Sequence, residues 1–159
     1  MGMTALGLRL PQIAERETRT LTVYGREDLP DGEYGFVELY CEDEKCDCQR
    51  VLIWVVSLAT GSKIWATINF GWESIEFYAR WTRNRELALQ MSGAHLDPIN
   101  PQSEYANVLL DYFVKMVADE EYVERLKRHY YQFRAATPIR SKVKAPNWRP
   151  AARLKRRLR

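Results

Sequence analysis

All three cysteines of the chain lie within eight consecutive residues, as Cys41, Cys46 and Cys48. If the flanking Tyr40 and Gln49 are paired across a hairpin, Cys41 and Cys48 come close together, and Cys46 lies in the loop between them. Thiolates that converge on one point are the ligands of tetrahedral zinc sites, in which each Zn–S distance is about 2.3 Å. The spacing therefore predicts a zinc site formed by these three cysteines.

The charges around the cysteines also favour a metal cation. Four carboxylates lie in the same segment, and only two basic residues, Lys45 and Arg50, lie close by. Zinc would supply the positive charge that keeps three adjacent thiols ionised. Two other states stay open: a disulfide between Cys41 and Cys48, and three thiols without a metal. The odd number of cysteines and an expected cytoplasmic location argue against the disulfide.

Three residues are candidates for the fourth ligand of the predicted zinc. His95 is expected in a loop, where an imidazole is free to bind zinc. Asp43 or Asp47 would instead supply an oxygen from the cysteine segment itself. The second histidine, His129, falls on the apolar stripe of a predicted helix, which favours a hydrogen-bonded histidine in the core.

Two classes of function fit such a site. In a non-catalytic binding module, the zinc staples the hairpin while the sheet and helices present a surface to a protein or to nucleic acid. In a metal-dependent hydrolase, the same ion activates water and a Glu or Asp acts as the base. Three thiolates are commoner in structural zinc sites, so we favour the binding module. The sequence contains no Gly-x-Gly-x-x-Gly, P-loop, His-Glu-x-x-His or Gly-x-Ser-x-Gly motif, so the common signatures of nucleotide-binding proteins, zinc proteases and serine hydrolases are absent.

Hydrophobic periodicity predicts an α+β fold. Alternating apolar residues indicate strands over 18–24, 33–40, 49–58 and 63–70, and the short connections make them a four-stranded antiparallel meander. Helical spacing follows Ser74, an expected N-cap, and continues over 85–91. A loop is expected from His95 to Pro101, after which Ser103 is expected to cap a third helix and Asp119 begins a fourth. The last two helices carry apolar stripes, formed by Tyr105, Leu109, Tyr112, Phe113 and Met116 and by Tyr122, Leu126, His129, Tyr130 and Phe133. Strands first and helices second, without strict alternation, are typical of this class.

A group of aromatic residues lies where the last predicted strand meets the first helix. Such a group is either a stacking platform for bases or the packing between sheet and helix. We favour packing, because aromatic side chains dominate core burial. The group consists of Trp65, Phe70, Trp72, Phe77, Tyr78 and Trp81.

Charge divides the chain into an acidic body and a basic tail. Residues 1–139 carry 15 Lys and Arg and 21 Asp and Glu, a net charge of −6, whereas residues 140–159 carry nine basic residues and no acid. We therefore expect a loosely attached segment over 1–17, one domain over 18–136, and a mobile tail over 137–159.

The tail is a candidate nucleic-acid arm. Its basic side chains would neutralise phosphates and its tryptophan would stack on an exposed base. A solvated tail, or one that folds back onto the acidic body, fits the same charges. The residues predicted to bind nucleic acid are Trp148, Arg153, Lys155, Arg156, Arg157 and Arg159.

No apolar run approaches the ~20 residues that a membrane helix requires. The longest, Val51 to Val56, is far shorter. The first ten residues also lack the basic start and long apolar stretch of a signal peptide, which predicts a cytoplasmic protein.

Overall fold

The structure is a computed structural model that describes residues 2–61, 63–136 and 149–150. Its elements follow one another along the chain as β1 (Met3–Ala5), the 3-10 helix η1 (Leu6–Leu8), α1 (Pro11–Glu17), β2 (Arg19–Val23), β3 (Gly32–Cys41), β4 (Arg50–Ser57), β5 (Lys63–Gly71), α2 (Ile75–Thr82), α3 (Arg85–Met91), β6 (Gly93–Leu96), α4 (Ala106–Val117), α5 (Glu120–Ala135) and β7 (Arg149–Pro150).

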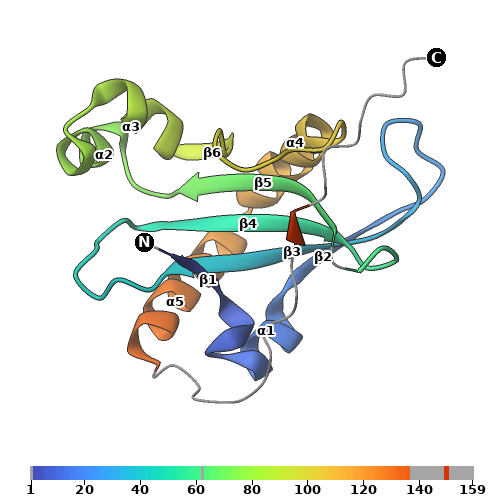
Figure 1. The fold of residues 1–159 in the computed structure, drawn as a ribbon, viewed down its shortest axis with the longest axis horizontal. Helices are drawn as coiled ribbons and strands as arrows, with labels where there is room; N and C mark the ends of the chain where they lie inside the picture. Colours follow the sequence, from blue (N-terminus) through green and yellow to red (C-terminus); the bar gives the residue numbers. More distant parts are fainter. Residues whose placement is uncertain (1, 62, 137–148, 151–159) are drawn as a thin grey trace.

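All the strands belong to one sheet with the order β1-β3-β4-β5-β6, in which β2 also pairs with β3 and β7 with β5. The pairs are antiparallel except for β7 on β5. The predicted meander is confirmed as β2, β3, β4 and β5, and the α+β class with it (Figure 1). No helix in the described part of the chain has the length and apolar character needed to cross a membrane.

The helices α4 and α5 cover one face of the sheet, behind the strands in Figure 1. Alternate residues of β3 point to this face, where Phe36 stacks on Phe113 of α4 and Tyr40 packs against Phe133 of α5. The stripe predicted for α5 is fully buried. Because each of these aromatic side chains removes a large apolar area from water, this layer supplies most of the hydrophobic core.

Residues 1–17 were expected to be loosely attached, but Met3–Glu17 contains β1, η1 and α1. Strand β1 pairs with the end of β3, so that Met3 lies opposite Cys41. Leu6 is buried in the main core, and Arg9 donates a hydrogen bond to the Phe133 carbonyl of α5 at 3.1 Å. Elements of three residues, such as β1 and η1, or of seven, such as α1, are too short for hydrophobic periodicity to define them from the sequence.

Two further predictions are corrected near β6. The segment from His95 to Pro101 was expected to be a loop, but Gly93–Leu96 pairs with β5 as an edge strand. Gly93 has a φ of 78°, which lets the chain turn directly from α3 into this strand. Ser103 was expected to cap the next helix, but α4 begins later, at Ala106, and the Ser103 hydroxyl accepts the Tyr105 amide at 3.2 Å.

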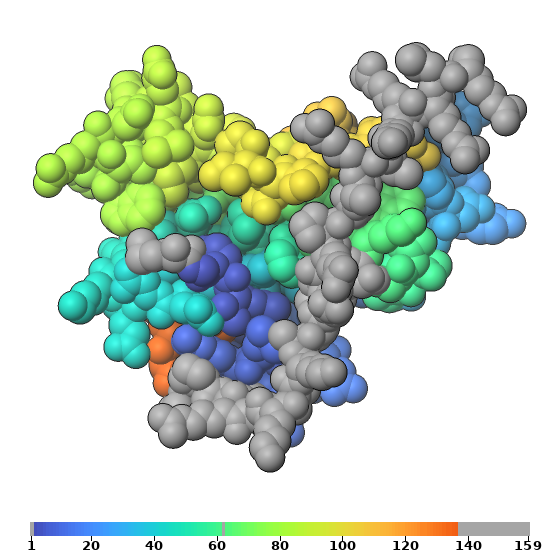
Figure 2. All heavy atoms as spheres, in the orientation of Figure 1, coloured from blue at the N-terminus to red at the C-terminus, as the bar shows by residue number. Residues whose placement is uncertain are grey.

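The helices α2 and α3 form a lobe that projects from one end of the sheet, at the upper left of Figure 2. The lobe has a small core of its own, made by Tyr78, Ala88 and Met91. Ser74 caps α2 as predicted, accepting the Phe77 amide. The lobe approaches β5 at Gly71, where a Cβ atom would lie 2.2 Å from the Met91 carbonyl oxygen and 2.5 Å from the Tyr78 hydroxyl. The lobe can therefore pack against β5 only with glycine at this position.

We expect Gly71→Ala to destabilise the protein by about 1–3 kcal/mol, because the added methyl group collides with a backbone carbonyl that cannot rotate away. Gly35→Ala is the matched control, since its Cβ would meet Val56 at 3.5 Å, an ordinary contact. Glycine within a strand is itself unfavourable, so the control should be neutral or slightly stabilised. Urea unfolding followed by circular dichroism measures both, and equal stabilities would contradict the steric argument.

Candidate metal centre

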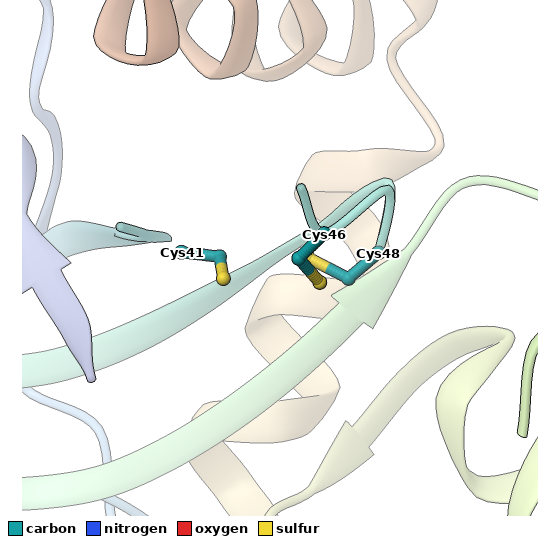
Figure 3. Close-up of side chains that lie close together, drawn as sticks. All are labelled: Cys41, Cys46 and Cys48. Atoms are coloured by element: carbon teal, nitrogen blue, oxygen red, sulfur yellow. The ribbon is translucent and has the colours of Figure 1, made fainter. Parts of the chain in front are cut away.

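The three cysteine sulfurs converge where β3 ends and the chain turns towards β4. Cys41 is the last residue of β3, and Cys46 and Cys48 lie in the connecting loop, with all three Sγ atoms within 4.8 Å of one another (Figure 3). Two sulfurs at tetrahedral positions about 2.3 Å from a zinc ion lie roughly 3.8 Å apart. The arrangement can therefore hold a metal ion after only a small movement of the side chains.

Burial sets the chemistry of these thiols. Cys41 and Cys48 are buried, Cys46 is half-buried, and none forms a disulfide. Desolvation, together with the neighbouring thiols, raises the pKa of Cys46 to about 12, and desolvation also raises the pKa of Cys48 against the opposing charge of Arg50. Three thiolates in this space therefore need a cation close by.

Helix α5 holds the metal loop, residues 42–47, against the body of the protein. The guanidinium group of Arg134 donates hydrogen bonds to the carbonyl oxygens of Asp43 and Glu44 at 3.3 and 2.9 Å. Within the loop, Asp43 accepts the Lys45 amide at 2.9 Å. The loop conformation is thus fixed by protein contacts as well as by any bound ion.

Gln49, directly after Cys48, is fixed by five hydrogen bonds. Its amide donates to Tyr130 at 3.4 Å, and its carbonyl accepts the Tyr78 hydroxyl at 2.5 Å. Its side-chain oxygen accepts Trp72 Nε1 at 3.1 Å and the Tyr131 hydroxyl at 3.2 Å, and its side-chain nitrogen donates to Asp47 at 2.6 Å.

The backbone of Gln49 is strained, with a φ of 45°. The left-handed region costs a residue with a side chain roughly 1–2 kcal/mol, and such strain persists only where the surroundings enforce it. Here it reverses the chain between Cys48 and β4, so that Cys48 is held beside the other two cysteines.

The structure does not bring the predicted fourth ligands to the sulfurs. His95 lies on β6, with Nε2 2.8 Å from the Ser92 carbonyl oxygen, and it is not part of the cysteine group. Asp43 and Asp47 are also outside that group, and their carboxylates accept hydrogen bonds from the Lys45 amide and the Gln49 side chain. Among the described residues, the cysteines alone form a group able to hold a metal.

A second cluster of titratable groups joins the N-terminal segment to the core. His129 is fully buried, with Nδ1 2.7 Å from Glu38 of β3 and Nε2 2.7 Å from Glu17 of α1. This confirms the prediction of a hydrogen-bonded core histidine. Burial alone would lower the pKa of His129, but the two carboxylates outweigh it and raise the pKa. The hydrogen bond from His129, with help from Arg128, lowers the pKa of Glu17.

Sequence reasoning missed Gln49 and Glu38, the residues on which these two clusters depend. The sequence pattern could have identified Glu38, because it alternates with Phe36 and Tyr40 and therefore lies on the same buried face of β3. A carboxylate on an apolar face, together with a histidine on the apolar face of a helix, predicts a buried pair. The sequence could not have predicted the left-handed backbone of Gln49, since glutamine does not favour a positive φ.

The residues predicted to bind nucleic acid, Trp148, Arg153, Lys155, Arg156, Arg157 and Arg159, lie outside the described residues. The aromatic group between strand and helix is accounted for mostly by packing. Trp65 stacks on Tyr105 at 5.2 Å and Trp72 packs edge-on against Tyr130 at 5.3 Å, whereas Trp81 is exposed.

In comparisons with protein-family models, curated proteins and solved structures, the chain finds no match.

Substitution at Gln49 should separate its two roles. Gln49→Ala removes an acceptor from Trp72 and Tyr131 and should lower stability by about 1–3 kcal/mol. Gln49→Gly loses the same bonds but relieves the left-handed strain, so it should be more stable than the alanine variant by about 1 kcal/mol. Urea unfolding measures both, and an alanine variant as stable as the glycine variant would show that the backbone is not constrained as we describe.

The His129 cluster predicts how stability changes with pH. Because the folded pKa of His129 is raised, its contribution is complete below the ordinary value near 6.5 and is lost as pH rises through the folded pKa. Glu17, whose pKa is lowered, loses its contribution as pH falls below about 4.5. Unfolding midpoints in urea should therefore fall as the pH is raised above about 6.5.

Glu17→Gln should make this alkaline loss of stability smaller, because it removes one of the two carboxylates that raise the pKa of His129. Glu124→Gln, which disrupts only the exposed pair with Lys127 on the same helix, is the matched control. Identical pH profiles for Glu17→Gln and the unmodified protein would exclude this role for the pair.

Proposed function

We propose that the protein is a non-catalytic binding module in which Cys41, Cys46 and Cys48 bind one structural zinc ion. The convergence of three sulfurs within 4.8 Å carries the proposal. Zinc is the preferred ion because it accepts thiolate ligands in compact sites without redox chemistry, and cysteine-rich zinc sites are commonly structural.

The position of the site supports a structural role. A bound ion would join the end of β3 to the start of β4, where the loop and the strained Gln49 meet. The hydrolase alternative needs a base beside the metal-bound water. Among the described residues, no histidine or carboxylate belongs to the cysteine group. The geometry therefore favours a structural zinc ion over the catalytic ion of a hydrolase.

The binding function of the module is proposed to include the basic tail. Residues 140–159 carry nine positive charges and no acid, which suits a weak and salt-sensitive contact with a polyanion. The zinc staple would keep the sheet and helices rigid while the tail supplies attraction that does not depend on sequence.

Protein purified without chelator should contain about one zinc per chain and no freely titrating cysteines. Chelation should then lower the free energy of unfolding, by about 4 kcal/mol if free zinc exceeds the dissociation constant about a thousandfold. Cys46→Ser is the variant of choice, because Cys46 is only half-buried and its replacement leaves the core intact. It should lose most of the metal.

Glu44→Gln, an exposed substitution in the same loop, is the control and should keep its zinc. Less than about a tenth of an equivalent of any transition metal, with three thiols that titrate once the chain is unfolded in urea, would refute the metal centre. An exchangeable water on a zinc ion in a crystal would instead favour the hydrolase.

A further inference from the structure

Three arginines and a tryptophan gather where α2 ends and α3 begins. Arg80, Trp81, Arg83 and Arg85 lie within six consecutive positions, and all four side chains are exposed. We call them the arginine–tryptophan turn. They are carried by the projecting α2–α3 lobe, away from the helices that cover the sheet (Figures 1 and 2).

The guanidinium groups of this turn have no acidic partner in the described part of the chain. The ion pairs found there involve Arg26, Lys127, Arg128 and His129, and none involves the turn. Glu76 and Glu86 lie on the same lobe but form no ion pair with it. The positive charge of the turn is therefore available to an external anion, within an acidic body that weakens the attraction.

Trp81 differs from the other tryptophans that the structure describes. It is 41% exposed, whereas Trp54, Trp65 and Trp72 are all partly buried. The small core of the lobe is made without it. Trp81 is in none of the aromatic pairs among the described residues. An exposed indole beside arginines that form no ion pair is a side chain on which an unpaired base can stack.

The turn is held in a fixed conformation by its own hydrogen bonds. The Thr82 hydroxyl lies 2.7 Å from the Tyr78 carbonyl oxygen and 2.9 Å from that of Asn84. Arg83 adopts a left-handed conformation with a φ of 55°, and the Asn84 side chain caps α3 by accepting the Leu87 amide at 3.1 Å. Little ordering would therefore be needed on binding.

We propose that the arginine–tryptophan turn binds single-stranded nucleic acid. Its guanidinium groups contact phosphates, and the indole of Trp81 stacks on a base. A single strand fits better than a duplex, whose base faces are already stacked. It also fits better than an acidic peptide, which offers no aromatic face. The inference rests on the proposed binding module and names its partner, but it uses different residues from the metal centre and the tail.

The test measures binding of the full chain to a fluorescein-labelled oligothymidine by fluorescence anisotropy at several salt concentrations. Trp81→Ala should weaken binding at least about fivefold, because stacking on one base is worth about 1–3 kcal/mol, and Trp81→Phe should retain most of the affinity. The combined Arg80→Gln, Arg83→Gln and Arg85→Gln variant should reduce the slope of log K against log salt by about two, since each phosphate contact on a single strand contributes about 0.7.

A charge-matched control removes three exposed cations elsewhere, through Arg16→Gln, Lys63→Gln and Lys115→Gln. This control should change the slope of log K against log salt by less than half of the change caused by the triple variant in the arginine–tryptophan turn. Equal effects of the two triple variants, no effect of Trp81→Ala, or no binding by the unmodified chain at low salt would each overturn the proposal. Tighter binding to duplex DNA or to a polyglutamate peptide would also overturn it. Zinc content measured on the same samples distinguishes these outcomes from loss of the metal centre.

Discussion

The strained backbone of Gln49 is the constraint on which the metal loop, the sheet and the α2–α3 lobe all depend. Its φ of 45° is unfavourable, and hydrogen bonds from elements far apart in the sequence hold it there. Tyr130 and Tyr131 come from α5, Tyr78 comes from α2, and Trp72 follows β5. The cysteines can converge because this residue turns the chain between them and β4.

The same contacts connect the metal loop to the lobe that carries the arginine–tryptophan turn, and both lie at the same end of the sheet (Figure 1). Tyr78 donates its hydroxyl to Gln49 and accepts the Thr82 hydroxyl with its carbonyl oxygen. One helical residue therefore connects the reversal beside Cys48 to the turn that carries the arginines. Gly71 makes this connection possible, because any side chain there would displace the Tyr78 ring from β5. Metal loop and lobe are held together by short polar contacts on a common scaffold.

Much of the fold follows from periodicity alone. The strands β2 to β5 and the stripes of α4 and α5 are long enough for apolar spacing to define them, and the clustered cysteines indicate a metal site directly. The features that the sequence did not predict depend on tertiary contacts. Strand β1 has three residues, and β6 pairs only because Gly93 turns it onto an existing edge. The left-handed Gln49 is imposed by its neighbours and has no local preference behind it.

The pair between Glu17 and His129 has a consequence for how the chain folds as it is made. These residues are 112 positions apart, and the neighbouring contact between Arg9 and Phe133 spans 124. At ~5–20 residues per second, roughly 5–20 seconds separate the synthesis of Glu17 from that of His129. The N-terminal segment leaves the ribosome long before α5 exists to hold it. The order of synthesis and the order of docking therefore differ, and the protein reaches its native state only after nearly the whole domain has emerged.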